Sequence, residues 1–184
     1  MSDADHWPWE FNFIGAKMSH NFYLYVVIEE VILRHTPRAI IELGTGKGAL
    51  TTVLGLWGVR LGIPVLSIDF RKLHNQDKIF EALGVQYLQA DFFQEETIGL
   101  LDIWIEIKSP LLLIIDGGDK EKEFNFFVPR LKEGSIVGVH DLDHEVDPDV
   151  IEEIAARHAH PFNKNQWRKN YVQFATYIID HENG

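Results

Sequence analysis

The chain has 184 residues, of which 46% are hydrophobic and 24% charged, a size and composition typical of a globular domain with a full core. Its 17 basic and 28 acidic residues give a net charge of −11, which argues against nonspecific binding to nucleic-acid backbones. The lack of cysteine excludes disulfides and thiolate chemistry. No signal-peptide pattern and no run of about 20 apolar residues is present, so we expect a single cytoplasmic domain over residues 1–184, without a membrane partner.

The N-terminal region is rich in aromatic residues, which are unusual at a mobile chain end. Two interpretations are open for residues 1–16: they cover one end of the core, or they fold over the ligand pocket as a lid or substrate wall. A helical period then predicts a helix over residues 17–35. Thr36 ends it, because a residue that precedes proline is disfavoured in the helical region.

Residues 39–48 have the pattern of a strand, a glycine turn and a helix start. Gly44, Gly46 and Gly48 follow the apolar strand, and apolar residues at helical spacing begin at Leu50. Glycines permit tight backbone angles and close ligand approach, and the free N–H groups of a first helical turn carry partial positive charge. This turn is therefore expected to bind a nucleotide-like ligand. Its G-x-G-x-G spacing differs from the G-x-G-x-x-G of dinucleotide-binding turns.

Strands and helices alternate along the rest of the chain, which indicates an α/β fold with a doubly wound, mostly parallel sheet and helices on both faces. In such folds ligands bind beyond the carboxyl ends of the strands. The polar residues expected at these ends are Asp69, Asp91, Asp116 and the pair His140-Asp141. We expect strands at residues 38–43, 63–70, 85–90, 111–115, 135–139 and 171–179, and helices at residues 17–35, 50–61, 77–83, 97–107, 121–132 and 149–158.

The pattern E-x-G-x-G-x-G, which begins at Glu42, resembles the first motif of class I S-adenosylmethionine-dependent methyltransferases, and with the later acids the resemblance covers residues 17–143. It implies a Rossmann-like methyltransferase fold in which the glycine turn passes under the methionine part of the cofactor. Asp69 would hold the ribose and Asp91 the adenine amino group, although Asp91 could equally cap the following helix. The cofactor-binding residues implied by the resemblance are Glu42, Gly44, Thr45, Gly46, Gly48, Asp69, Phe70, Asp91, Phe92 and Asp116.

The segment after the fourth expected strand bears on the substrate. Residues 116–119 read Asp-Gly-Gly-Asp, where enzymes that methylate adenine or cytosine amino groups carry an Asn/Asp-Pro-Pro-aromatic motif. Residues 116–141 are instead most similar to cephalosporin-hydroxylase-like methyltransferases, which are related to the catechol-type O-methyltransferases. In those groups an acid after the fourth strand and an adjacent pair after the fifth hold a divalent cation. The resemblance thus implies Asp116, His140 and Asp141 as metal ligands.

A cation at this position makes chemical sense, because it lowers the pKa of a substrate hydroxyl and orients it. Oxygen ligands suit Mg²⁺, whereas His140 shifts the preference toward Mn²⁺, iron or another transition metal. The candidate catalytic residues are Asp116, Lys120 and His140, and the general base stays open among Lys120, Asp119 and His144. Without a metal, His140 and Asp141 would form a hydrogen-bonding or proton-transfer pair.

The expected function is O-methylation of a small-molecule hydroxyl. Two alternatives stay open: a nicotinamide-dependent oxidoreductase, which the glycine spacing and Glu42 disfavour, and an inactive cofactor-binding protein. After the fifth strand the family adds an antiparallel pair, whereas only one strand, at residues 171–179, is expected here. Such a trimmed sheet suggests a homo-oligomer in which a second subunit supplies a substrate wall.

Overall fold

The computed structural model describes residues 11–18, 20, 22–72, 76–142, 145–161 and 174–181. Its main sheet is mixed and has the strand order β5-β4-β3-β6-β7-β9-β8. Strands β5 to β7 of this order are parallel, β9 is antiparallel to β7, and β8 is antiparallel to β9. The predicted doubly wound sheet with an antiparallel last strand is therefore confirmed. The strands are β3 (Ile40–Leu43), β4 (Val65–Asp69), β5 (Val85–Gln89), β6 (Leu112–Ile115), β7 (Ile136–His140), β8 (Ala159–Pro161) and β9 (Phe174–Ile179).

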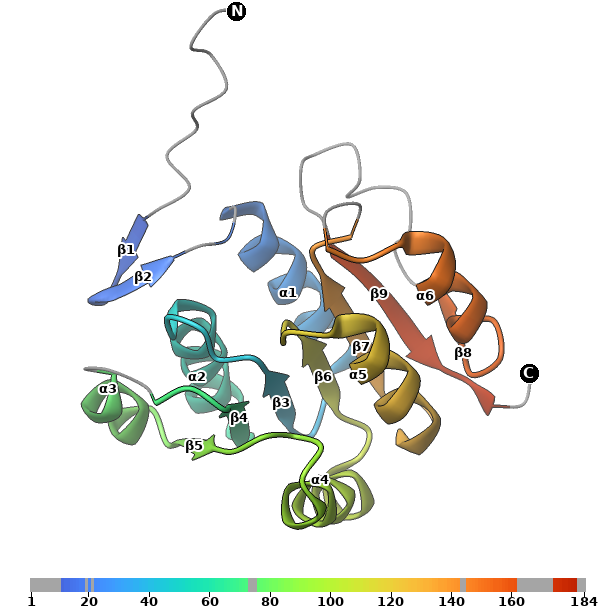
Figure 1. Cartoon of the computed structure of the whole chain (residues 1–184). Helices are drawn as coiled ribbons and strands as arrows, with labels where there is room; N and C mark the ends of the chain where they lie inside the picture. Colours follow the sequence, from blue (N-terminus) through green and yellow to red (C-terminus); the bar gives the residue numbers. More distant parts are fainter. Residues whose placement is uncertain are drawn as a thin grey trace, which may run out of the picture.

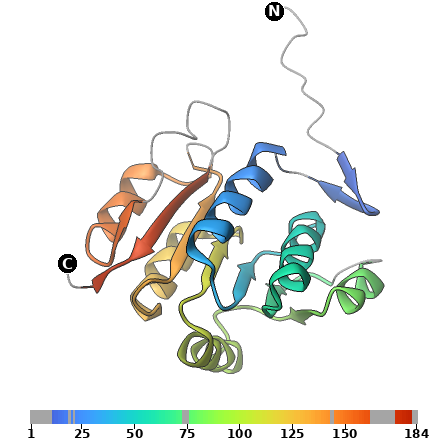
Figure 2. The ribbon, with the colours of Figure 1, turned by 180° about the vertical axis from the view of Figure 1, so that it is seen from behind.

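Helices cover both faces of this sheet. One face carries α4 (Glu95–Lys108), α5 (Lys120–Phe127) and α6 (Pro148–Ala155), which lie in front in Figure 1. The opposite face carries α1 (Phe22–His35), α2 (Ala49–Leu61) and α3 (Asp77–Ala82), as Figure 2 shows from behind. Each layer forms its own apolar cluster with the sheet. Strands β3 and β6 are buried at every residue because they lie between the two layers, which explains the unbroken apolar sequence of β6.

Helix boundaries follow the local sequence signals closely. Gly62 ends α2 with a left-handed φ of 67°, and the side chain of Asp147 accepts a hydrogen bond at the start of α6. The helix expected over residues 121–132 is shorter than predicted. It ends at Phe127 and continues as a 3-10 turn, Val128–Arg130, because Pro129 has no N–H to donate to the preceding turn.

The N-terminal end of the predicted helix over residues 17–35 is wrong. α1 begins at Phe22, and the residues before it form a hairpin of β1 (Phe11–Phe13) and β2 (Ala16–Met18). Ile14 and Gly15 at its tip have φ of 48° and 79°, the left-handed pair that a two-residue hairpin turn requires. This hairpin contacts α2 through β2. Residues 1–10 of the predicted lid lie outside the described residues.

The sheet is also not trimmed at its C-terminal edge, which corrects a second expectation. β8 pairs with β9, so the antiparallel pair is present within the described residues. The sequence did not reveal β8 because it has three residues, too few to show a period of two, and includes Pro161, which an edge strand tolerates. The reason given for a second subunit therefore falls away. Among the residues that the structure describes, no helix is both long and apolar enough to cross a bilayer.

Candidate functional site

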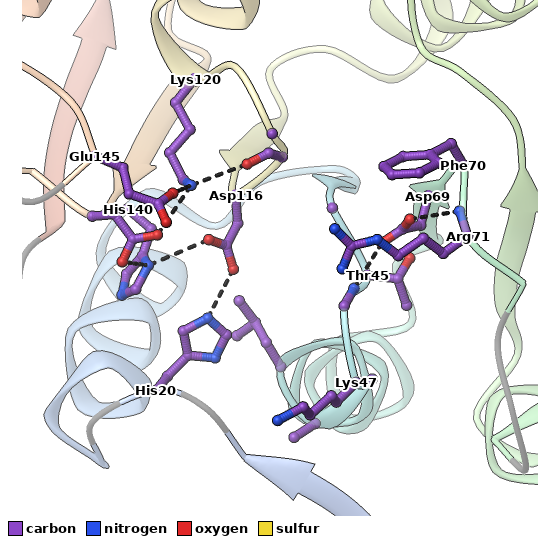
Figure 3. A pocket seen from close by; sticks show the side chains of 18 of the residues that line it. His20, Thr45, Lys47, Asp69, Phe70, Arg71, Asp116, Lys120, His140 and Glu145 are labelled. Carbon is purple, nitrogen blue, oxygen red and sulfur yellow. Dashed lines mark hydrogen bonds and ion pairs between the residues drawn. The ribbon is translucent and has the colours of Figure 1, made fainter. Parts of the chain in front are cut away.

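The carboxyl ends of β3, β4, β6 and β7 open into one cavity of about 560 Å³ (Figure 3), within the 300–1,000 Å³ typical of small-molecule sites. Glu42, Asp91 and Asp119 lie outside this lining, and His144 lies outside the described residues. The predicted residues that line the cavity are Gly44, Thr45, Gly46, Gly48, Asp69, Phe70, Phe92, Asp116, Lys120, His140 and Asp141. The cavity also contains residues that the sequence did not single out, among them His20, Lys47, Arg71 and Glu145.

The glycine turn after β3 forms the floor of the cavity. Gly44 has a φ of 98° and lies so close to Asp116 that a Cβ would be 2.2 Å from the Asp116 carbonyl oxygen. Gly48 precedes α2 with a φ of 80°, and no side chain caps the helix. Ala49, in its first turn, lines the cavity. Uncapped N–H groups at that turn favour a negatively charged ligand group.

Asp69 is tied to this turn by its own carboxylate. Oδ2 accepts a hydrogen bond from the Gly46 N–H at 2.9 Å, and Oδ1 accepts one from the Arg71 N–H at 2.8 Å. A carboxylate oxygen has a second lone pair, so each can still accept a bond from a ligand hydroxyl. The neighbouring Phe70 is 58% exposed with the Arg71 guanidinium over its ring, whereas Phe92 is buried.

Glu42 lies beneath the turn and not in the cavity. It is fully buried, and its Oε2 accepts hydrogen bonds from the hydroxyls of Thr51 and Ser67, both at 2.5 Å. Ser67 in turn lies 2.6 Å from the Thr45 hydroxyl. Burial raises the pKa of Glu42 to about 8, although the bonds from Ser67 and Thr51 oppose the shift. Glu42 therefore supports the turn as a neutral acid instead of touching a cofactor directly.

This raised pKa makes a testable prediction about stability. Between the ordinary pKa of 4.5 and the folded value of about 8, the unfolded chain loses the Glu42 proton and the native chain keeps it, so the free energy of unfolding falls as pH rises. Glu42→Gln keeps the acceptor oxygen and removes the titration. Urea unfolding at pH 5 and pH 8 should show that Glu42→Gln gains stability relative to the wild type at the higher pH. A pH-independent difference would contradict the assignment of a buried neutral acid.

A second group of side chains lies across the cavity, around Asp116 after β6 (Figure 3). Its Oδ2 is 2.8 Å from Nε2 of His20, and its Oδ1 is 3.3 Å from Nδ1 of His140. Burial would raise the pKa of Asp116, but its hydrogen bonds with His140 and His20 outweigh burial and hold the pKa well below its ordinary value. Burial likewise opposes the charge on His140, yet its contacts with Asp116 and Asp141 raise its pKa to about 9.

Lys120 and Asp141 form the rim of this group. The Lys120 ammonium is 3.0 Å from Oδ2 of Asp141 and 2.6 Å from Oε2 of Glu145, and it donates to the Gly117 carbonyl at 3.0 Å. Burial lowers the pKa of Lys120, but the bonds to Glu145 and Asp141 outweigh it and raise the pKa. Its three protons thus have three acceptors. This disfavours Lys120 as a general base and makes it the residue that positions Asp141.

The neighbouring strand ends bring Asp116 and His140 together, as predicted, but the third member of the group differs. Within the described residues, ligand atoms of His20, Asp116 and His140 lie within 4.8 Å of one another, whereas Asp141 is paired with Lys120. His20 was missed because it precedes α1, outside the strand-and-turn units, and no motif or period marks it. Asp119 caps α5 by accepting from the Lys122 N–H, which disfavours it as a base.

No family model and no curated protein matches the chain. Solved structures do match it. The apo structure of CmcI has a TM-score of 0.70 and 16% identity, over 92% of this chain and 76% of that chain. CmcI with magnesium and S-adenosylmethionine has a TM-score of 0.68 and 16% identity, over 92% of this chain and 77% of that chain. CalS11, a TDP-rhamnose 3'-O-methyltransferase of calicheamicin biosynthesis, has a TM-score of 0.60 and 16% identity, over 85% and 79%. The chain therefore has the methyltransferase fold that the glycine motif predicted.

Proposed function

We propose that the chain is an S-adenosylmethionine-dependent methyltransferase that transfers a methyl group to a hydroxyl of a small molecule with the help of a divalent metal ion. The observation that carries the proposal is the shared cavity: the glycine turn with Asp69 and the group around Asp116 line it from opposite sides. CmcI with magnesium and S-adenosylmethionine, and the O-methyltransferase CalS11, support it as proteins of the same fold. No observation favours the nicotinamide alternative.

The cofactor half of the cavity fits S-adenosylmethionine in its donors and its space. A Cβ built on Gly46 would meet no atom within 4 Å, so a ligand can approach the backbone there. Asp69 has lone pairs for the ribose hydroxyls, and Phe92 offers an apolar surface to the adenine ring. The uncapped start of α2 suits the carboxylate of the methionine part. When bound, the cofactor supplies an electrophilic methyl group.

The opposite half fits a divalent cation, because an ionised, nearly buried carboxylate and an imidazole converge there. Asp116 and His140 would hold the ion, and Asp141, the third ligand predicted from the sequence, lies 2.8 Å from His140 Nδ1. A cation at this place lowers the pKa of a hydroxyl and makes it a better nucleophile. Lys120 forms an ion pair with Asp141, whose backbone has a left-handed φ of 60°, a conformation that aspartate adopts more readily than most residues.

Titration calorimetry of the full chain with S-adenosylhomocysteine and with NAD tests the proposal. We expect the former to bind and NAD not to bind. Binding of NAD alone would overturn the proposal. If neither ligand bound, the proposed reaction would have no methyl donor.

Asp69→Ala should weaken S-adenosylhomocysteine binding by about 10- to 100-fold, since hydrogen bonds to a charged group contribute about 1.5–3 kcal/mol each. The matched control is Asp77→Ala, which removes an exposed acid from α3 and should leave the affinity unchanged. The same calorimetric titration measures both variants. Equal affinities for the two variants would show that the ribose is not held by Asp69.

A further inference from the structure

We propose that His20 is a ligand of the metal site, and that the resulting set of two imidazoles and one carboxylate selects a transition-metal ion such as Mn²⁺, Fe²⁺ or Co²⁺ over Mg²⁺. The inference deepens the proposed function and rests on it for the reaction. Metal binding itself can be measured without a methyl acceptor. This ligand set differs from the predicted one, which had Asp141 as its third member in place of His20.

The distances from Asp116 to the two histidines fit a shared ion, and the ligand atoms of the three residues lie within 4.8 Å of one another. Two ligand atoms that lie about 2.1 Å from a common metal at a right angle are about 3.0 Å apart. Asp116 offers one oxygen to each histidine, at 2.8 Å from His20 Nε2 and 3.3 Å from His140 Nδ1. These distances lie on either side of that value. Figure 3 shows both imidazoles turned toward Asp116, and their ring centroids are 4.7 Å apart.

The three side chains come from separate elements and are shielded from solvent. His20 precedes α1, Asp116 follows β6 and His140 ends β7. Their side chains are 15%, 11% and 12% exposed, so the sheet edge and the chain before α1 hold them in place. All three residues line the same cavity as the glycine turn. A metal with three protein ligands on one side and open positions toward a cavity can accept a substrate oxygen.

The charges around the group distinguish Asp116 from Asp141 as a ligand. Asp141 lies 2.8 Å from His140 Nδ1, but its other oxygen is 3.0 Å from the Lys120 ammonium. A cation next to Asp141 would be repelled by that ammonium, which is itself nearly buried. Among the described residues, the ion pairs of the Asp116 carboxylate are with His20 and His140 and not with a lysine or an arginine. It is therefore the carboxylate best able to neutralise a metal ion.

The donor types set the metal preference. Mg²⁺ prefers oxygen ligands in near-octahedral geometry, whereas imidazole nitrogen suits zinc, copper, iron and nickel. Two histidines with one carboxylate and open positions are the ligand pattern of non-haem Fe²⁺ sites. With His20 included, nitrogen supplies two of the three protein donors in the group. The site should thus discriminate against Mg²⁺ more strongly than His140 alone would.

The test measures metal binding to the metal-free full chain by electron paramagnetic resonance of unbound Mn²⁺, with Mg²⁺ as competitor. We expect the wild type to prefer Mn²⁺. His20→Ala should weaken Mn²⁺ binding by at least about 10- to 100-fold, the loss typical even of an outer-shell partner. The matched control is His160→Ala, which removes a histidine that is 52% exposed on β8 and should change nothing. His20→Asp should shift the preference back toward Mg²⁺.

A second readout counts the imidazole ligands directly. In the Co²⁺-loaded wild type, paramagnetic proton NMR should show two metal-bound imidazole N–H resonances, and His20→Ala should show one. A single resonance in the wild type, or unchanged Mn²⁺ affinity in a folded His20→Ala protein, would overturn the role of His20 and leave the methyltransferase proposal intact. If the wild type binds S-adenosylhomocysteine but neither Mn²⁺ nor Co²⁺, the metal site is wrong while the cofactor site stands. The wild-type spectrum decides the matter even if the variant fails to fold.

Discussion

Replacing Asp116 with asparagine should weaken Mn²⁺ binding by more than about 100-fold, beyond the loss expected for an outer-shell partner, while S-adenosylhomocysteine affinity stays within about threefold of the wild type. Asparagine has nearly the same shape as aspartate but no charge. Within the part of the chain that the structure describes, Asp116 is the carboxylate among the three residues whose ligand atoms converge, and the other two are His20 and His140. The cofactor donors lie across the cavity, around Asp69. Electron paramagnetic resonance and calorimetry on the same preparation give the two affinities.

Asp141→Asn is the matched control, because it removes a neighbouring carboxylate that is paired with Lys120. Its Mn²⁺ affinity should fall much less than that of Asp116→Asn. The pKa of His140 also checks that the Asp116 charge was removed, since the contact with Asp116 helps to raise this pKa to about 9 in the metal-free chain. NMR titration of the Asp116→Asn protein should place that pKa closer to 6.5. Equal loss of Mn²⁺ binding in both variants would contradict the distinction between the two carboxylates.

The second large effect is expected at Gly44. A Cβ there would lie 2.2 Å from the carbonyl oxygen and 2.5 Å from the carbonyl carbon of Asp116, and the φ of 98° disfavours any other residue. Because the obstructing atoms are backbone, they cannot rotate away. Gly44→Ala should lower the free energy of unfolding by about 3–5 kcal/mol, the sum of overpacking and backbone strain. Urea unfolding measures the loss.

Gly46→Ala is the matched comparison for Gly44→Ala. Gly46 has a φ of 54°, but a Cβ there meets nothing within 4 Å. Its alanine variant should lose only about 1–2 kcal/mol from the left-handed backbone. The added methyl group enters the space proposed for the cofactor, so S-adenosylhomocysteine binding should fall even though the protein stays folded. Similar stability losses in the two variants would contradict the close approach of Gly44 to Asp116.

The sheet and the composition of its carboxyl edge could be predicted because parallel strands impose strong sequence patterns. β6 is buried on both faces, so its sequence has no alternation, and Asp116 stands out as the polar residue that ends the run. The same logic located Asp69 and His140. Since neighbouring parallel strands end at one edge, the meeting of Asp116 with His140 followed from topology alone.

His20 could not be predicted in the same way, because its position depends on how the chain enters α1 and not on the sheet. The β1–β2 hairpin that precedes it has three-residue strands, which are too short to show a periodic pattern. The turn pair Ile14-Gly15 gave a weak signal, since isoleucine rarely adopts a positive φ. A histidine before a helix is ordinary by itself. Only the three-dimensional contact with Asp116 makes it a candidate ligand.

Glu42 and Lys120 were both predicted as site residues, but the structure gives each a different role from the predicted one. The glycine motif placed Glu42 among the cofactor contacts, yet its hydrogen bonds with Thr51 and Ser67 are made below the turn. Lys120 was one of three candidate general bases, with Asp119 and His144. Its pairing with Glu145 depends on a contact across 25 positions of sequence, which no local pattern could reveal.

A crystal structure of the full chain with S-adenosylhomocysteine and Mn²⁺, with anomalous data collected to locate manganese, tests the central claim most directly. We predict cofactor density over Gly44, Gly46 and Asp69, with its sulfur directed toward the group around Asp116. An anomalous peak is expected among His20, Asp116 and His140. Cofactor density elsewhere on the molecule, or a cavity that contains S-adenosylhomocysteine but gives no manganese peak at these three side chains, would contradict the account.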